Sequence, residues 1–358
     1  MALYSVIIGS GSYLPERIIP NEDFHSRVFL DANGTPFERS SEEIVRRFRE
    51  ITTIEERRYV TDDLNCSDIA TIAAQRAVES AGIDPESLDH IIVAHNWGDI
   101  KANTKRSDQV PSIGSRVKHN LGISNPDCIP YDLPFGCPGW VQGMIHANYF
   151  LKAGGGKRAL VIGAETLSRV VDPHDRDQML YADGAGATIL EAQESPIPVG
   201  IVTHKTRSDT QKEAYLLWQQ NSFNPERPVD ELYLKMHGHT LYKYALGHVP
   251  EVVKETIDKA GLTLGDINKV LIHQANAKMD EAILKRLFRL YNEKEVPEHL
   301  MPLTVGYLGN SSVATVPTLY DLIMKGKLED QEINPGDWVV LASVGAGMNI
   351  NSIVYKMP

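Results

Sequence analysis

The sequence has few cysteines, and none of them is spaced as a metal site requires. Only three cysteines occur among the 358 residues, Cys66, Cys128 and Cys137, and no two of them form the CxxC spacing of a structural zinc site. An odd number of widely separated cysteines also argues against a disulfide framework. We therefore expect a reduced chain in the cytoplasm that binds no metal.

Long apolar runs and an excess of positive charge are missing as well. No apolar stretch reaches the roughly 18 residues of a membrane span, and residues 1–9 lack the basic start of a secretion signal. Lys and Arg total 36 against 47 Asp and Glu, which gives a formal net charge of −11. No general affinity for nucleic acid or membrane is expected, and an acidic partner would need a local basic patch.

What the sequence does have is an internal repeat. Residues 81–93 match residues 260–272, and residues 160–164 match residues 339–343, in both cases 179 residues apart (260 − 81). Each copy predicts an amphipathic helix that ends at a glycine, Gly82 or Gly261, followed by a loop and a buried strand. Two α/β halves, residues 1–195 and 196–358, are the resulting hypothesis, and coincidence is the alternative.

Two kinds of segment fall outside this pattern. Residues 22–50 and 205–235 are polar, contain proline and show little periodicity, so we interpret them as insertions or lids. The glycine-rich segments 183–187 and 345–348 have neither Walker nor Rossmann spacing. We expect glycine there to allow close approach of strands or substrate rather than to hold a phosphate.

Cys137 is the first candidate for chemistry. It precedes a run, Val141–Leu151, that predicts a long apolar helix, and Pro138 suits the first helical position, where a missing N–H costs nothing. At a helix N-terminus the dipole and free amides lower a thiol pKa and favour the nucleophilic thiolate. The alternative is a small buried side chain, the commonest fate of a free cysteine.

Two polar residues of the second half are further candidates. His273 directly follows the apolar run 270–272, and α/β folds place chemistry at the C-terminal ends of such strands. A lone histidine is also often an ordinary buried polar residue. Asn310 lies in a turn rich in glycine and serine, where capping a helix is its simplest role. The residues alone leave both alternatives open.

Together these motifs resemble the β-ketoacyl-acyl-carrier-protein synthase III family of thiolase-fold condensing enzymes, essentially from end to end. The resemblance rests on residues 8–15, 133–140, 162–167, 183–187, 273–276, 309–312 and 345–347. It implies an α/β thiolase fold, with duplicated α/β halves in a five-layer α-β-α-β-α arrangement, and a homodimer. It also implies an acyltransferase of fatty-acid or related lipid and polyketide biosynthesis.

Carried over position by position, the resemblance assigns roles to single residues. Cys137 is implied as the nucleophile that takes up an acyl primer, and His273 and Asn310 as the pair that binds the malonyl thioester. The backbone amides of Cys137 and Ala346 are implied as an oxyanion hole, with alanine where the family usually has glycine. The family also implies a substrate pocket that includes Val110, Gly345 and Gly347. Its substrates are thioesters of coenzyme A or acyl carrier protein, and no cofactor is implied.

This chain departs from the family where coenzyme A would bind. Arg176 matches an arginine near the nucleotide, but the tryptophan that stacks on the adenine is missing where the chain reads Ser41-Glu42-Glu43-Ile44. An acyl carrier protein is therefore expected to be able to deliver both substrates. Val110 stands where the family often has a phenylalanine that reaches into the partner subunit's acyl pocket, which predicts a primer longer or bulkier than acetyl.

The segment after His273 predicts an amphipathic helix with a basic face, on which an acidic carrier protein could dock. The basic residues are Lys278, Lys285 and Arg289. A simply solvated face is the alternative.

Three other functions compete with the primary synthase. A specialised ketosynthase of the dialkylresorcinol or polyene type would use long acyl or β-ketoacyl substrates. A catalytically silent partner subunit would lack part of the triad, yet Cys137, His273 and Asn310 are all present. A cysteine hydrolase has the same order of residues, but it explains neither the repeat nor the glycine-rich segments.

Overall fold

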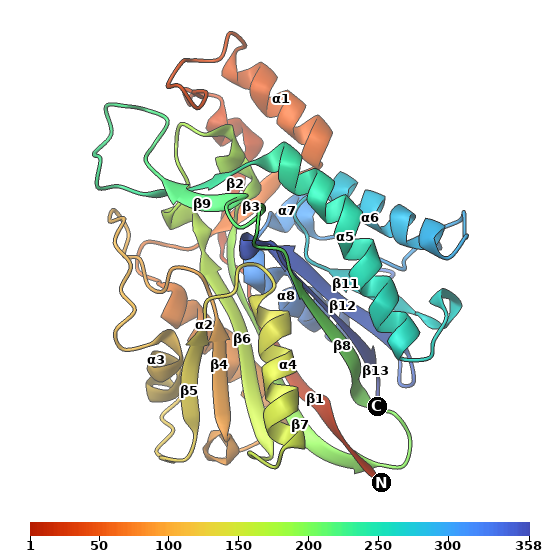
Figure 1. Ribbon diagram of the computed structural model, residues 1–358. Helices are drawn as coiled ribbons and strands as arrows, with labels where there is room; N and C mark the ends of the chain where they lie inside the picture. Colours follow the sequence, from red (N-terminus) through yellow and green to blue (C-terminus); the bar gives the residue numbers. More distant parts are fainter.

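Two β-sheets form the framework of the computed structural model, which describes residues 1–358 (Figure 1). The first sheet has the order β1-β7-β6-β4-β5, with β1 at Ala2–Tyr13, β4 at His90–Ala94, β5 at Ile129–Leu133, β6 at Arg158–Thr166 and β7 at Asp183–Ser195. The second has the order β11-β12-β13-β8, with β8 at Gly200–Ser208, β11 at Lys269–Ile272, β12 at Trp338–Gly345 and β13 at Asn349–Lys356.

Helices separate the sheets and cover their outer faces. Between the sheets lie α4 (Gly139–Lys152) and α8 (Thr315–Met324), whose apolar side chains pack with strands of both sheets in one core. The first sheet is covered by α2 (Cys66–Ala81) and α3 (Ile113–Asn120), and the second by α5 (Gly238–Lys259) and α6 (Ala277–Leu290). The predicted five-layer α/β arrangement is confirmed. No helix is long and apolar enough to cross a membrane.

The repeat seen in the sequence recurs in the sheets. The order β1-β7-β6-β4 in the first sheet equals β8-β13-β12-β11 in the second, and β4–β6 and β11–β12 are both parallel pairs. Helix α2 ends as expected, with Gly82 as a left-handed cap at φ 62°, and α5 ends at Lys259, two residues before Gly261 at φ 72°. Because the strand order repeats, we propose that the chain divides into two halves at residue 195.

The two segments expected to be irregular contain regular elements. Residues 22–50 include most of the helix α1 (Ser41–Thr52), and Ser40 caps its N-terminus, because the hydroxyl of Ser40 accepts the Glu43 amide at 3.3 Å. Ile44 and Val45 anchor α1 in a small apolar cluster, so residues 41–50 are regular, and the interpretation as an insertion or lid stays a prediction. Residues 205–235 contain the end of β8, then β9 (Leu217–Gln220) and the start of β10 (Tyr233–Met236).

Short elements complete the chain. They are β2 (Arg17–Pro20), β3 (Glu56–Tyr59), α7 (Val305–Leu308) and the 3-10 helices at Asn21–Phe24, Pro85–Ser87, Leu167–Arg169, Arg176–Leu180, Leu264–Asp266, Ser312–Ala314 and Ala346–Met348. Helix α7 and the turn at Ser312–Ala314 lead into α8. They therefore bring the Asn310 motif to the space between the sheets.

Candidate active site

Cys137 lies in the tight loop between β5 and α4. Gly136 before it has a φ of 67°, and a Cβ added there would lie 2.8 Å from the Ala346 nitrogen, so only glycine fits. Pro138 is the cap of α4 rather than its first helical residue, and the helix begins at Gly139. Cys137 therefore immediately precedes the helix N-terminus, and its backbone lies close to the turn that follows β12.

The thiol of Cys137 is in its protonated form at neutral pH. Burial raises its pKa to about 11, whereas the hydroxyl of Ser312, which donates to Sγ at 3.1 Å, lowers it. The expected low thiol pKa is not met, because desolvation of the buried sulfur outweighs the hydrogen bonds that reach it. Ser312 holds a φ of 54°, an uncommon backbone conformation for serine that aims its hydroxyl at the sulfur.

His273 lies where the sequence predicted, at the C-terminal end of β11, and its amide donates to the carbonyl of Ala342 at 2.8 Å. Only 3% of the residue is exposed. Burial lowers the pKa of its imidazole to about 4, so the ring is neutral at physiological pH. Its Nδ1 lies 2.9 Å from the hydroxyl oxygen of Thr315, which in turn lies 2.9 Å from the Ser312 carbonyl.

Asn310 is held at its backbone and at one end of its carboxamide. Its backbone pairs with both sides of Tyr181, since its amide donates to the Leu180 carbonyl and its carbonyl accepts from the Ala182 amide, each at 2.9 Å. Its Oδ1 accepts the Ser312 amide at 2.8 Å. Asn310 thus does cap a turn, as in the simplest interpretation, but the cap uses only the oxygen and leaves the NH₂ group for another acceptor.

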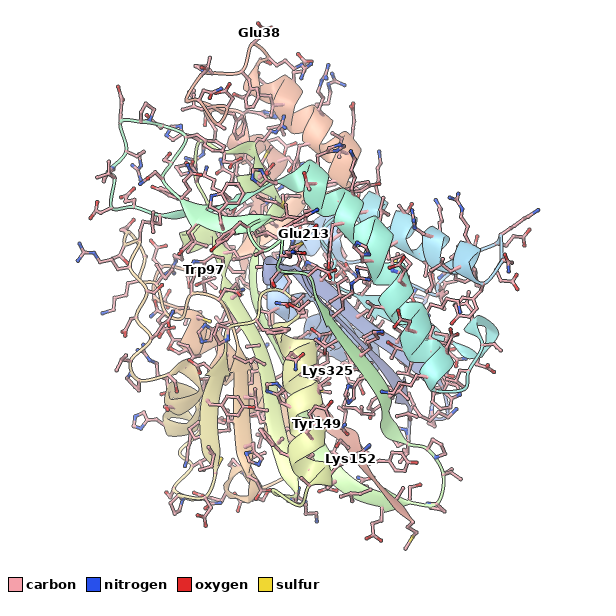
Figure 2. The ribbon with its side chains drawn as sticks, viewed as in Figure 1. Glu38, Trp97, Tyr149, Lys152, Glu213 and Lys325 are labelled. Carbon is pink, nitrogen blue, oxygen red and sulfur yellow. The ribbon has the colours of Figure 1, made fainter.

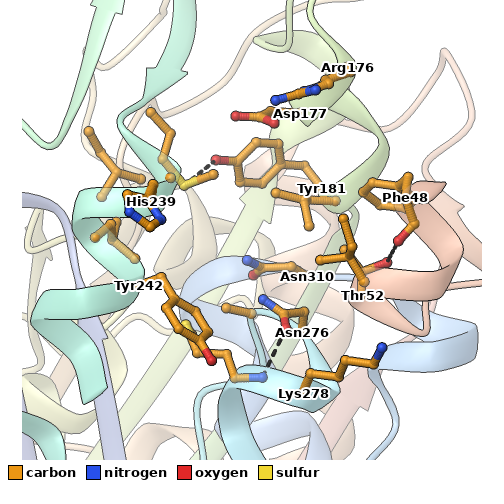
Figure 3. Close-up of a pocket in the computed structure, with 18 of the residues that line it drawn as sticks. Phe48, Thr52, Arg176, Asp177, Tyr181, His239, Tyr242, Asn276, Lys278 and Asn310 are labelled. Atoms are coloured by element: carbon orange, nitrogen blue, oxygen red, sulfur yellow. Dashed lines mark hydrogen bonds between the residues drawn. The ribbon is translucent and has the colours of Figure 1, made fainter. Parts of the chain in front are cut away.

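Two cavities meet at Cys137. The larger, about 520 Å³, is lined by Cys137, His273 and Asn310 and by residues of α1, α5 and α6. Figure 3 shows Phe48 of α1, Tyr242 of α5 and Lys278 of α6 around it. The smaller, about 180 Å³, has mainly apolar walls, from Trp97, Leu167, Tyr181, Leu217, Trp218, Leu234 and Ala346. The fold thus brings the three predicted residues of chemistry to one cavity.

The other predicted site residues are spread more widely. Arg176, Lys278 and Gly345 line the larger cavity, and Ala346 lines the smaller one. Lys285 and Arg289 lie on the exposed face of α6. Val110 is 87% exposed and, like Gly347, lines neither cavity of its own chain.

Sequence reasoning missed several residues of the site. Ser312 lies within the motif that contains Asn310, and Thr315 lies just after it. The sequence therefore pointed to this segment but not to the contacts that these two residues make. The arginines in and just before α1 were missed because the helix itself was not predicted. Arg39 and Arg47 line the larger cavity with Arg176 and Lys278, and Asp177 is the one carboxylate among its lining residues. The cavity is therefore basic in a chain of net charge −11.

Comparisons with known proteins point to one family. The family model of 3-oxoacyl-[acyl-carrier-protein] synthase III matches residues 131–209, and the model of its C-terminal part matches residues 257–357. A curated β-ketoacyl-[acyl-carrier-protein] synthase III of Bradyrhizobium diazoefficiens is 34% identical over 357 residues, 98% of each chain.

Solved structures agree with this assignment. The 3-oxoacyl-[acyl-carrier-protein] synthase III of Aquifex aeolicus VF5 is 28% identical, with a TM-score of 0.78 over 98% of this chain and 99% of that one. The priming β-ketosynthase of the R1128 polyketide biosynthetic pathway is 26% identical, with a TM-score of 0.81 over 99% and 96% of the two chains. The chain belongs to the 3-oxoacyl-[acyl-carrier-protein] synthase III family of condensing enzymes.

Proposed function

We propose that Cys137, His273 and Asn310 perform the condensation in this chain, joining an acyl primer to the malonyl group of malonyl-acyl carrier protein with loss of CO₂. The observation that carries the proposal is that Cys137 belongs to both cavities, while His273 and Asn310 line only the larger one. A primer held on the sulfur can therefore occupy one cavity while a second thioester approaches through the other.

The first half-reaction is acyl transfer to Cys137. The sulfur attacks the thioester carbonyl of the primer, the new S–C bond forms, and the bond to the carrier sulfur breaks. The proton of the Cys137 thiol leaves with the carrier thiol. Negative charge develops on the carbonyl oxygen, and the backbone amides of Cys137 and Ala346 stabilise it. The close approach of Gly136 to the Ala346 nitrogen supports this assignment, because it brings the two amides to one place.

The second half-reaction uses the polar pair. The malonyl thioester loses CO₂, and the resulting enolate carries its charge on the thioester oxygen. Asn310 can donate through its free NH₂ group, and the neutral imidazole of His273 can donate through Nε2 when the Thr315 hydroxyl donates to Nδ1. The enolate carbon then attacks the acyl group, a C–C bond forms, and the Cys137 sulfur leaves as a thiolate that takes up a proton from solvent. The scheme takes acyl thioesters as its substrates and uses no cofactor.

The basic mouth of the larger cavity supports an acidic acyl carrier protein as the donor. Arg47 of α1 and Lys278 of α6 lie on neighbouring elements, since Lys278 contacts the Glu50 carbonyl of α1, and Arg39 lies just before α1 begins. Lys285 and Arg289 extend this surface along α6. Arg176 lies over the ring of Phe37, with 5.2 Å between its guanidinium carbon and the ring centre. We propose that Arg176 binds the phosphate of the prosthetic arm on which the carrier protein holds its acyl group.

A homodimer is part of the proposal. Strand β5 is the edge of the first sheet, with no partner on its outer side. An exposed strand edge with apolar side chains is a surface that proteins normally cover. Ile129 of β5 is 51% exposed, and Val110 is 87% exposed. Both support pairing with a second copy. The cytoplasmic location expected from the unpaired cysteines stays a prediction.

The smaller cavity favours a primer longer than acetyl, as Val110 predicted. An acetyl group would leave much of a 180 Å³ apolar space unfilled, and unfilled apolar space forfeits packing energy. A specialised synthase with longer acyl substrates is therefore the second candidate function, and similarity to a priming polyketide ketosynthase supports it.

The test is a reconstituted condensation with acyl primers of increasing length and malonyl-acyl carrier protein, followed by mass spectrometry of the carrier product. The wild type is expected to form a 3-oxoacyl carrier protein. Cys137→Ala, His273→Ala and Asn310→Ala are each expected to lose it. Undiminished product from Cys137→Ala would contradict the proposed nucleophile, and a strong preference for acetyl would contradict the second candidate.

A further inference from the structure

The structure contains a buried carboxylate that the proposed reaction does not use. Glu165 lies near the end of β6, in a motif that the sequence singled out, and only 1% of it is exposed. Its Oε2 accepts two hydrogen bonds from Asn96, one from the backbone amide at 3.1 Å and one from the side-chain Nδ2 at 2.6 Å. A buried carboxylate is costly unless hydrogen bonds satisfy it, and here one residue supplies both.

Asn96 also forms a hydrogen bond to the loop that carries Cys137. Its Oδ1 accepts the backbone amide of Gly136 at 2.9 Å. Gly136 directly precedes Cys137 and is so close to Ala346 that a Cβ would lie 2.8 Å from the Ala346 nitrogen. The side chain of Asn96 thus links the Glu165 carboxylate to the residue that precedes Cys137 and lies close to Ala346, the two residues whose amides are assigned to the oxyanion hole.

We propose that Asn96 and Glu165 are positioning residues for the oxyanion hole: Glu165 orients the carboxamide of Asn96, which fixes the Gly136 amide and so the spacing between the amides of Cys137 and Ala346. This inference rests on the proposed function, because it assigns these residues to the acyl-transfer step. An amide oriented in advance stabilises a developing oxyanion without reorganising during the reaction. A small displacement of either amide is expected to slow acyl transfer.

The charge of Glu165 depends on pH near neutrality. Burial raises its pKa to about 7, and the charge of Asp183 also raises it. The nearby charge of His95 and the hydrogen bonds from Asn96 act in the opposite direction. Two thiols also face it, since its charge raises the pKa of both Cys66 and Cys137. Above pH 7 the carboxylate is ionised and binds the Asn96 donors most strongly. Below pH 7 it takes up a proton, and its hold on Asn96 weakens.

Two reactions of the same sulfur separate positioning from other effects. Acylation of Cys137 by an acyl thioester needs the oxyanion hole, whereas alkylation by iodoacetamide needs only a reactive and accessible thiol. Both rates can be measured on one sample by intact-mass analysis. Removal of the link by Asn96→Ala is expected to slow acylation about 10- to 100-fold, while alkylation changes by less than about threefold. Because Asn96 also lines the smaller cavity, acylation is measured at saturating primer.

Glu165→Gln is the conservative variant. Its amide oxygen can still accept from Asn96 but carries no charge, so acylation is expected to fall less than in Asn96→Ala. In the wild type, the ratio of acylation to alkylation is expected to rise with pH through about 7, and in Glu165→Gln this rise should disappear. The matched control is Glu191→Gln in β7, whose carboxylate pairs with Arg158 at the opposite end of β6. It is expected to retain both rates and the rise with pH.

Each outcome decides between clear alternatives. Equal acylation by wild type and Asn96→Ala would overturn the positioning role and leave the proposed function intact. Parallel loss of acylation, alkylation and thermal stability would also overturn it, because the link would then serve folding alone. A wild type that no thioester acylates would contradict the proposed function, and with it the oxyanion hole that these residues position.

Discussion

The hydroxyl of Thr315 lies between two possible acceptors. Its Oγ1 is 2.9 Å from Nδ1 of His273 and 2.9 Å from the Ser312 carbonyl. A threonine hydroxyl has a single proton. When it donates to Nδ1, Nε2 carries the imidazole proton and can donate to an enolate. When it donates to the Ser312 carbonyl, Nδ1 carries the proton and Nε2 can only accept. The first arrangement is the one that condensation needs.

Thr315→Val should therefore separate the two half-reactions. Valine keeps the shape of threonine but cannot donate to Nδ1, so the imidazole proton of His273 is no longer held on Nε2. Condensation is expected to fall about 10- to 100-fold, with acylation of Cys137 nearly unchanged. Single-turnover mass spectrometry with and without malonyl-acyl carrier protein measures both steps. Thr315→Ser is the control and should retain both, whereas full condensation activity in Thr315→Val would refute the assignment.

Ser312→Ala should make Cys137 a weaker nucleophile. The Ser312 hydroxyl donates to Sγ at 3.1 Å and lowers the pKa of a thiol that burial has raised to about 11. A hydrogen bond to a charged group contributes about 1.5–3 kcal/mol, which corresponds to about one to two pKa units. Alkylation by iodoacetamide at pH 8 is expected to slow at least about tenfold, with the pH profile displaced upward. An unchanged profile would show that the hydroxyl does not interact with the thiolate.

Charge reversal on α6 tests the docking surface. Lys285→Glu combined with Arg289→Glu should raise KM for malonyl-acyl carrier protein severalfold, because exposed charges govern association with a charged partner. The effect should shrink at high salt, as screening predicts. The control reverses two exposed lysines elsewhere, Lys152 and Lys327; Figure 2 shows Lys152 at the far end of α4. Equal KM values for both double variants would contradict docking on α6.

Lys235 should be important for stability rather than for chemistry. It is 1% exposed and contacts Asp172 at 2.6 Å and Asp175 at 3.1 Å, which fastens β10 to the first half. Lys235→Met leaves both carboxylates in the interior without a cation, although backbone amides still donate to them, which is expected to cost about 3–5 kcal/mol of unfolding free energy. Urea denaturation measures this, with Lys212→Met as the control, an exposed lysine that also lies in residues 205–235.

The pH dependence of this deficit has a definite sign. Lys235 and the backbone amides of His174 and Phe223 hold the pKa of Asp172 below its ordinary value, against the effect of burial. The stabilisation is therefore present above the pKa of the unfolded chain, about 3.9, and is lost as the pH falls through the folded value. The difference between wild type and Lys235→Met is expected to shrink in acid. A deficit that grows with acidity would contradict this account.

Much of the framework was predictable from residue pattern. The repeat at a fixed offset predicted two similar sheets. Its signals, Gly82 and the buried strand after each helix, are local, and the tertiary contacts of the fold agree with them. Helix α1 was missed because its sequence is dominated by charged residues, and its apolar side chains find their partners only in distant segments such as Phe24 and Phe29.

The candidate site was likewise predictable only in part. Cys137, His273 and Asn310 stand in recognisable motifs, and the fold brings them to one cavity. The thiol pKa could not be foreseen, because it depends on burial by residues far apart in the chain. The Asn96 link to Glu165 and Gly136 joins three separate loops and strands, 69 and 40 residues apart in sequence, so no local pattern could show it.

The most direct test of the central claim is the mass of the intact protein after incubation with acyl-carrier-protein and acyl-coenzyme A primers, before and after addition of malonyl-acyl carrier protein. We predict one acyl group on the wild type, none on Cys137→Ala, and discharge of that group as a 3-oxoacyl product when malonyl-acyl carrier protein arrives. An acyl group that persists on Cys137→Ala, or no acylation of the wild type by any primer, would contradict Cys137 as the nucleophile of a condensing enzyme.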